Sequence, residues 1–554
     1  MAFQITGPDK ESAERFAKAV FLVVDDFQGM RSMLRDILRN CGANASAIDM
    51  AANGSEAVTM LGKRRYDVVL CDFDLGPGKN GQQVLEEAKH RQLVGPGSCW
   101  VMVTAEKSTE TVMGAGEYQP DAYLVKPITE TMLSGRLARL WQKKGAFAAI
   151  DKAMAAHDYL KAIRLCDERL TTDRANAADL LRLKCDLLLK VGDPDAARKV
   201  YESILAQRDV PWAQVGLARL HFQGGDLEAA RDLLEQVVDI NRSYLEAYDW
   251  LARTQLALGD TEGAQAVLGR AVALSPNSVT RQKNLGEIDL KLGNLDGAER
   301  AFRKSVALGK HSILKTADAY LGLAKAYGGK ANPVEAMKVL AEVGKEFDTP
   351  EVQLKAKLTE GLVHRQAGNE AAAREAARSV AELLDQSAAQ LDSTTSIEMA
   401  QFMLTSGETE KALAVLDAEV RNNPENGQLL AEVDKVLEGT DLAEQGRAMI
   451  EATRLESIEM MNRGVLLARE ERYEDAVSAM RAARDKMPAN VRVLLNFSYV
   501  LLVALQKTGY DRDRIREARE CLLRANTLSP GEKRFAQLMS LLENLERDAA
   551  SRQD

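Results

Sequence analysis

The chain has 554 residues, more than a single hydrophobic core supports, so we expect at least two domains. It carries 73 Lys and Arg against 82 Asp and Glu, a net charge of −9, and shows no basic face, which argues against a nucleic-acid partner. No apolar stretch approaches the length of a membrane span, so no membrane partner is expected. Six scattered cysteines without a CxxC motif predict reduced, buried thiols in a cytoplasmic protein.

Residues 1–19 are charged and amphipathic, which predicts an N-terminal helical extension instead of a signal peptide. Four short apolar runs follow, at 20–24, 68–71, 101–103 and 123–125, separated by helical stretches, and such runs predict buried parallel strands. Because the carboxyl ends of parallel strands share one edge of a sheet, the polar residues that follow these runs should meet in one pocket. In chain order they are Asp25 with Asp26, Asp72, Thr104 and Lys126.

These side chains predict phosphoryl chemistry. Three clustered carboxylates repel one another unless a cation lies among them, and Mg²⁺ prefers such oxygen ligands. The ion would bring a phosphoryl donor to one carboxylate, and a carboxylate can accept the group as an aspartyl-phosphate. Thr104 would donate a hydrogen bond to the phosphoryl oxygens and Lys126 would pair with them.

With these motifs, residues 20–141 resemble the receiver domain of two-component response regulators, and chemotaxis regulators in particular. The resemblance implies an α/β doubly wound, flavodoxin-like fold with a five-stranded parallel sheet. It implies that Asp72 is the phosphoacceptor, and that Thr104 and Lys126 sense the phosphoryl group. The implied Mg²⁺ ligands are Asp25, Asp26, Asp72 and the backbone carbonyl of Asp74.

The same resemblance assigns roles to residues around this pocket. Tyr123 takes the place of the aromatic switch, and the Lys126–Pro127 bond would be cis. Asp74 and Glu106 would tune the attack of water on the phosphoryl group. The chain departs from the family in the loop at 75–81, Leu-Gly-Pro-Gly-Lys-Asn-Gly, which is longer and richer in glycine than usual.

From Phe147 onward the strand pattern gives way to a repeat of about 34 residues, which resembles the tetratricopeptide repeat, a helix–turn–helix unit. The clearest copy has Leu251 and Ala252 in its first helix, a Gly259-Asp260 turn, and Ala264 in its second helix. Small residues would let the two helices approach closely, and the Gly-Asp pair would end the first helix. Similar small residues follow in later copies, at Gly286, Ala324 and Gly464.

The repeat predicts an all-α superhelical solenoid over residues 147–545, with about ten or eleven helix pairs and a tail at 546–554. A wider gap between Ala412 and Ala476 leaves room for one degenerate unit around residues 427–455. The concave groove of such an array typically binds a protein partner. Candidate groove positions are Arg219, Arg253, Asn284, Lys291 and Asn496.

Together these features predict a bacterial response regulator that a sensor histidine kinase or phosphotransfer protein phosphorylates, with output through protein–protein interaction. The receiver would phosphorylate and dephosphorylate only itself, and a phosphorylation-dependent dimer is a further option. The alternative is a constitutive repeat scaffold whose receiver serves only for docking or dimerisation. No second catalytic motif follows Phe147, which argues against an enzyme under receiver control.

Overall fold

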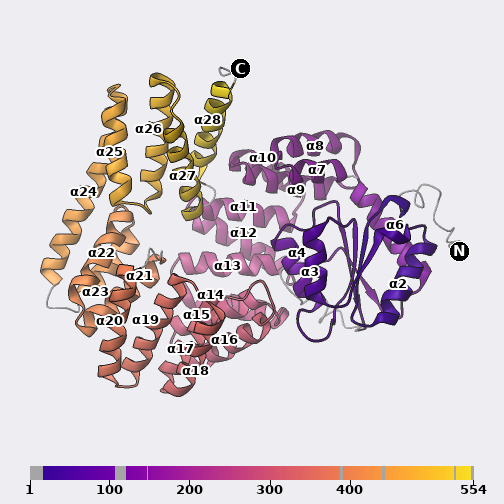
Figure 1. The fold of residues 1–554 in the computed structure, drawn as a ribbon, viewed down its shortest axis with the longest axis horizontal. Helices are drawn as coiled ribbons and strands as arrows, with labels where there is room; N and C mark the ends of the chain where they lie inside the picture. The colour runs from indigo at the N-terminus through magenta and orange to yellow at the C-terminus, as the bar shows by residue number, and fades with distance from the viewer. Residues whose placement is uncertain are drawn as a thin grey trace. The chain divides into compact units, whose positions relative to one another are not determined.

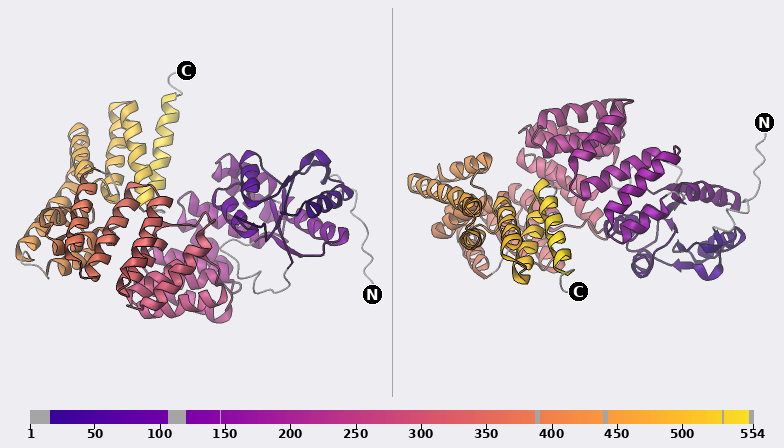
Figure 2. Two further views of the ribbon diagram at one scale, coloured as in Figure 1. Left: turned by 60° about the horizontal axis from the view of Figure 1, so that its bottom comes forward. Right: turned by 90° about the horizontal axis from the view of Figure 1, so that it is seen from above.

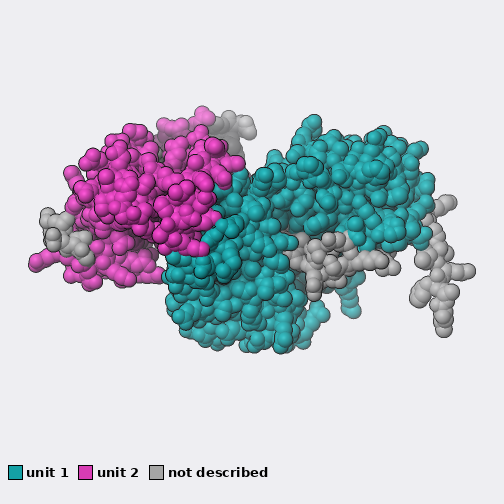
Figure 3. Space-filling model, turned by 90° about the horizontal axis from the view of Figure 1, so that it is seen from below, with its two compact units in different colours: residues 1–188, 195–323 teal, residues 189–194, 324–554 magenta. Residues whose placement is uncertain are grey.

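The computed structural model describes residues 16–105, 120–145, 147–386, 391–438, 443–529 and 532–550. The predicted helical extension falls largely on residues 1–15 and Glu106 on the segment 106–119, both outside the described residues. The chain divides into two compact units, residues 1–188 with 195–323 and residues 189–194 with 324–554 (Figure 3).

The N-terminal part of the first unit is a five-stranded parallel sheet, as the resemblance implied (Figure 1). The strand order is β2-β1-β3-β4-β5, so the chain reverses its direction across the sheet at β1 and β3. The strands are β1 (Phe21–Val24), β2 (Ile48–Ala51), β3 (Val68–Asp72), β4 (Cys99–Thr104) and β5 (Ala122–Val125).

Alternating side chains of each buried strand feed two separate cores. On β1, Phe21 and Val23 belong to one core with helices α2 (Gln28–Asn40) and α6 (Glu130–Gly145). Leu22 and Val24 belong to the other, with α3 (Gly54–Lys63) and α4 (Gly81–His90). Both faces of the sheet are therefore covered, which explains why the strand sequences are continuously apolar. A single 3₁₀ turn, Ala45–Ala47, precedes β2.

Paired helices make up most of the remaining described residues (Figure 2). Those of the first half are α7 (Ala148–Ala155), α8 (Tyr159–Thr172), α9 (Ala177–Lys190), α10 (Pro194–Leu205), α11 (Pro211–Gln223), α12 (Leu227–Ile240), α13 (Leu245–Ala257), α14 (Thr261–Leu274), α15 (Val279–Lys291), α16 (Leu295–Gly309), α17 (Ala317–Gly329) and α18 (Pro333–Glu346). Those of the second half are α19 (Pro350–Gln366), α20 (Glu370–Gln386), α21 (Ser393–Ser406), α22 (Thr409–Asn422), α23 (Gly427–Glu438), α24 (Ala443–Arg469), α25 (Tyr473–Lys486), α26 (Val491–Thr508), α27 (Arg512–Leu528) and α28 (Lys533–Ala550).

The turn inside a pair follows the predicted pattern. Gly259 has a φ of 85°, a conformation that glycine adopts without steric cost. Asp260 then caps α14, with its side chain accepting a hydrogen bond from the amide of Gly263 at 2.9 Å. The cap satisfies one of the free amides at the start of the helix and fixes the angle at which the second helix begins.

The helices of a pair meet where a small residue of the first faces a large residue of the second. A Cβ atom added at Gly286 of α15 would lie 2.9 Å from the Phe302 ring of α16. Gly464 of α24 faces Met480 of α25 in the same way. The predicted close approach at Gly286 and Gly464 is thus present.

Two segments have helix lengths that differ from those of the simple repeat. The predicted degenerate unit consists of the short α23 and the first part of α24, a 27-residue helix that continues into the next unit. The last helix continues to Ala550, past the predicted start of the tail at residue 546, because no glycine or proline interrupts its sequence.

Among the described residues, one helix does have the length and composition that a membrane span requires, which corrects the expectation that no apolar stretch approaches that length. This helix is α26, and 61% of the window that passes the test is buried. Its apolar residues pack with α25, α27 and α28 in one core, as expected for a central helix of the array.

Candidate acidic phosphoacceptor pocket

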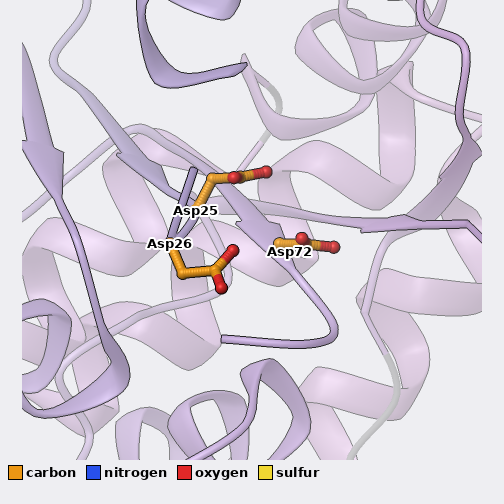
Figure 4. A group of neighbouring side chains, drawn as sticks. All are labelled: Asp25, Asp26 and Asp72. Carbon is orange, nitrogen blue, oxygen red and sulfur yellow. The ribbon is translucent and has the colours of Figure 1, made fainter. Parts of the chain in front are cut away.

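Three carboxylates meet at the carboxyl edge of the sheet (Figure 4). Asp25 and Asp26 follow β1, and Asp72 is the last residue of the neighbouring strand β3. One ligand oxygen from each lies within 4.8 Å of the others. Asp25 and Asp72 are buried, whereas Asp26 is exposed, so the cluster opens to solvent on one side. The structure thus brings together the three acidic side chains that the sequence indicated.

Lys126, which follows β5, reaches across this cluster. Its Nζ lies 2.7 Å from Oδ2 of Asp72 and 3.1 Å from Oδ2 of Asp25. Burial raises the pKa of Asp72, and the nearby Asp25 adds to the rise while Lys126 opposes it. Burial lowers the pKa of Lys126, but its hydrogen bonds to Asp72 and Asp25 outweigh this and raise it, so the ammonium stays charged.

The remaining predicted residues lie around this centre. Thr104 ends β4 and is buried, and its carbonyl accepts a hydrogen bond from the Lys126 amide at 2.8 Å. Tyr123 is half-buried against the α3–α4 core, and burial raises its pKa. The Oδ1 atom of Asp74 accepts a hydrogen bond from the Gly76 amide nitrogen at 3.1 Å. The Lys126–Pro127 bond is cis, as the resemblance implied.

Two residues that the sequence analysis missed, Arg31 and Gly81, contact backbone carbonyls of the pocket and hold it in shape. Arg31 on α2 donates from Nη1 to the carbonyls of Asp25, at 2.6 Å, and Asp26, at 3.0 Å. Gly81 at the start of α4 lies so close to β3 that an added Cβ would overlap the carbonyl oxygen of Asp72. Arg31 lies five residues beyond the Asp-Asp motif and Gly81 at the end of the unusual loop, but neither position alone signals the contact.

The donor set fits a hard divalent cation. Asp25, Asp26 and Asp72 offer only oxygen atoms, and Mg²⁺ prefers oxygen ligands and retains some water. One open, exposed side at Asp26 suits an ion that keeps part of its hydration. In addition, Asp25 and Asp72 place like charges side by side, and a bound cation would offset their repulsion.

The candidate groove positions of the repeats have different environments. The guanidinium groups of Arg219 and Arg253 lie 5.2 and 5.1 Å from the ring centre of Trp250, which the sequence analysis did not single out. Asn284 is half-buried and Lys291 exposed. Asn496 is buried, and its side-chain oxygen accepts a hydrogen bond from Arg534 at 3.0 Å, so this position is covered by α28. The sequence pattern could not reveal that cover, because α28 lies outside the repeat period.

Comparisons with known proteins agree with the two-part architecture. The family profile of the response regulator receiver domain matches residues 21–138, and two tetratricopeptide repeat profiles match residues 188–254 and 251–313. Chemotaxis protein CheY-3 of Vibrio cholerae is 32% identical over 128 residues, which cover 22% of this chain and 91% of that protein.

Solved structures show matches to each part. Chemotaxis protein CheY4 of Vibrio cholerae is 27% identical, with coverage of 22% of this chain and 97% of that one, and a TM-score of 0.19. A tetratricopeptide repeat protein from Parabacteroides merdae is 14% identical, with coverage of 47% and 98% and a TM-score of 0.32. On its sequence match to the receiver profile and to CheY-3, the chain belongs to the two-component response regulators, with a receiver domain joined to tetratricopeptide repeats, a protein–protein interaction module.

Proposed function

We propose that this response regulator is a phosphorylation-switched adaptor. A histidine kinase or phosphotransfer protein would phosphorylate Asp72 in a Mg²⁺-dependent reaction, and the repeats would carry the signal to a protein partner. The observation that supports this most is the convergence of Asp25, Asp26 and Lys126 on the Asp72 carboxylate, in a chain that continues into a repeat array.

In the proposed reaction, a carboxylate oxygen of Asp72 attacks the phosphorus of the phosphohistidine. The phosphorus–oxygen bond forms as the phosphorus–nitrogen bond breaks, with its electron pair going to the imidazole. Mg²⁺, when bound by Asp25, Asp26, Asp72 and the Asp74 carbonyl, would neutralise the charge that develops on the phosphoryl oxygens.

Lys126 and Thr104 would then hold the product. The Lys126 ammonium, which already lies 2.7 Å from the acceptor carboxylate, would pair with the phosphoryl oxygens, and the Thr104 hydroxyl would donate to them. Tyr123 would move inward as the receiver changes state. A phosphoryl group that favours one state by a few kcal/mol shifts the population that the partner sees. Asp74 and Glu106 would set the rate at which water removes the group.

The cellular setting belongs to the same proposal. All six cysteines are buried and free, which supports a reducing, cytoplasmic compartment. Dimerisation of the phosphorylated receiver is compatible with this function and would be detected as a change in mass in solution.

A second candidate function is the constitutive scaffold, in which the receiver only docks. It gains support from a direct contact between the receiver and the repeats within the first unit, where Nζ of Lys79 donates to the carbonyl of His311 at 2.9 Å. In this alternative the contact would be permanent, and occupancy of the pocket would have no effect on partners.

Labelling of the full-length chain by acetyl phosphate separates the two. We expect Mg²⁺-dependent labelling of the wild type and none of Asp72→Asn, because the amide cannot accept the group. Asp36→Asn, an exposed carboxylate on α2, is the matched control and should label like the wild type. Absence of wild-type labelling, or retention of label in Asp72→Asn, would contradict the proposal.

Partner capture completes the experiment. Beryllofluoride with Mg²⁺ mimics the phosphoryl group, and the proposal expects it to change the set of proteins that the wild type retains. Asp72→Asn should retain the same set with and without the mimic. A wild-type set that is indifferent to beryllofluoride would favour the constitutive scaffold.

A further inference from the structure

One segment of the repeats contacts the receiver beside the phosphoacceptor. The end of α16 and the connection to α17 (residues 308–312) lie against the start of α4. Nζ of Lys79 donates to the His311 carbonyl at 2.9 Å, and Nε2 of Gln83 donates to the Leu308 carbonyl at 3.1 Å. The Ser312 hydroxyl donates to Oε2 of Glu86 at 3.4 Å. We call this set of three hydrogen bonds the latch.

The chemistry of the latch fits a specific contact. The last carbonyl groups of a helix have no partner inside the helix and carry partial negative charge. Lys79 and Gln83 supply a cation and an amide donor to the carbonyls at and just beyond the end of α16. Lys79 also pairs with Glu87 of α4 at 2.8 Å, which fixes its direction.

Polar residues on α4 are buried on the side where the repeats make their hydrogen bonds. Val84, Leu85 and Ala88 face the sheet core. Gln82 and Glu86, one turn apart on another side of the helix, are only 5% and 6% exposed. A carboxylate is rarely so buried on the surface of an isolated domain, because loss of its hydration is costly.

The latch is joined to the pocket by a short piece of chain. Residues 73–80 connect Asp72 to α4, and this loop carries both Asp74, the proposed metal ligand, and Lys79 of the latch. Its two ends are in contact, since the Gly81 amide donates to the Phe73 carbonyl at 2.9 Å and Gly81 adjoins the Asp72 carbonyl. A shift of this loop around a modified Asp72 would therefore be transmitted to Lys79, whose Nζ bonds the His311 carbonyl.

We propose that the latch is an autoinhibitory contact, in which residues 308–312 hold the receiver in its unmodified arrangement until a phosphoryl group on Asp72 opens it. The latch is complete while Lys126 lies on the acceptor oxygen of Asp72, an arrangement that the phosphoryl group must replace. This inference rests on the proposed function and adds the element that carries the signal to the repeats.

Thermodynamic linkage between the latch and the Asp72 pocket provides a test of this proposal. If modification of Asp72 opens the latch, opening the latch by mutation must strengthen the binding of a phosphoryl mimic by the same factor. In Ser312→Asp, the new carboxylate would face Glu86 and repel it. The Asp side chain could still accept the hydrogen bond from the Leu314 amide, which Ser312 Oγ accepts at 3.0 Å. The loop would keep its turn while the contact with α4 is lost.

The experiment is calorimetric titration of the full-length chain with beryllofluoride in the presence of Mg²⁺. Ser312→Asp should bind the mimic about fivefold more tightly than the wild type, or more, as expected for a typical coupling between sites. Ser203→Asp on α10 is the control, because Ser203 is exposed and its hydroxyl donates within its own helix, to the Val200 carbonyl. It should bind like the wild type.

Hydrogen exchange on the wild type gives a readout that does not depend on a variant. Beryllofluoride should increase the exchange of amides 308–316 and of the first turn of α4. Equal affinity in Ser312→Asp and the wild type, weaker affinity in Ser312→Asp, or unchanged exchange would overturn the latch. Failure of the wild type to bind beryllofluoride at all would instead overturn the proposed function, and the latch with it.

Discussion

At the scale of single residues, some groups of the pocket can be recognised in the sequence and others only in the structure. Asp25, Asp26, Asp72, Thr104 and Lys126 could be found from the sequence, because each follows an apolar run and parallel strands end at one edge. Gly81 and Arg31 could not, since their roles come from contacts with backbone carbonyls that only the fold creates.

Gly81→Ala tests the closeness of α4 to the acceptor strand. The new methyl group would overlap the Asp72 carbonyl, so we expect the receiver to lose about 1–3 kcal/mol of stability and acetyl phosphate labelling to slow. Gly62→Ala on α3, where an added Cβ meets nothing within 4 Å, should be neutral or slightly stabilising. Chemical denaturation followed by Trp fluorescence measures both variants, and equal stability of the two would contradict the account.

At the scale of helices, the repeats are specified by size complementarity. Phe302 of α16 lies against Gly286 of α15 and Gly322 of α17, so one ring fills the space that two glycines leave. Phe402 of α21 faces Gly361 of α19 in the same manner. The period and the small residues could be predicted from sequence. The continuous helix α24 could not be predicted. It runs past residue 455, where the degenerate unit was expected to end, and nothing in the sequence there indicates whether the helix stops or continues.

Gly286→Ala tests this complementarity. The added methyl group would press against the Phe302 ring, so we expect a loss of about 1–3 kcal/mol in the free energy of unfolding. Reducing the ring in Gly286→Ala/Phe302→Leu should recover part of the loss, which a local backbone effect would not. Gly269→Ala on α14 is the control, since no atom lies within 4 Å of its added Cβ. Thermal unfolding followed by circular dichroism distinguishes the three.

At the scale of the whole molecule, each repeat helix packs mainly against helices next to it in the chain, so local damage should stay local. Repeats contact mainly their neighbours, so stability is close to a sum of nearest-neighbour terms. The parallel strands and the helical repeat could be predicted from the sequence pattern, and the doubly wound fold from the family resemblance. The latch could not, because it joins residues far apart in the chain and involves ordinary surface residue types, Lys, Gln, Glu and Ser.

Glu517 on α27 provides a pH-dependent test of whether damage in the repeats stays local. Its carboxylate on α27 accepts hydrogen bonds from Arg481, at 2.7 Å, and Arg484, at 2.8 Å, on α25. Burial raises the pKa of Glu517, but the two guanidinium groups outweigh this and lower it. Because the pKa is lower in the folded state than in the unfolded state, the carboxylate stabilises the fold above about pH 4.5, and this is lost as pH falls further.

Glu517→Gln should therefore cost about 1 kcal/mol at pH 7, a modest value because Arg481 is 43% exposed, and the difference from the wild type should shrink below pH 4. Glu520→Gln, an exposed carboxylate on the same helix, should change little. Thermal unfolding at pH 7 and pH 3.5 measures both, and Asp72 labelling should be unchanged in either variant. A pH-independent loss, or reduced labelling, would contradict the prediction.

The sequence separation of the latch has a consequence for protein synthesis. Lys79 and His311 are 232 residues apart, and ribosomes add about 5–20 residues per second. About 170 residues separate the end of the receiver from this segment, so the receiver would be complete roughly 10 to 35 seconds before its covering segment is made. During that interval α4 of the nascent chain would lack this cover, so the proposed restraint would begin only once translation has passed the fifth helix pair, α15 with α16.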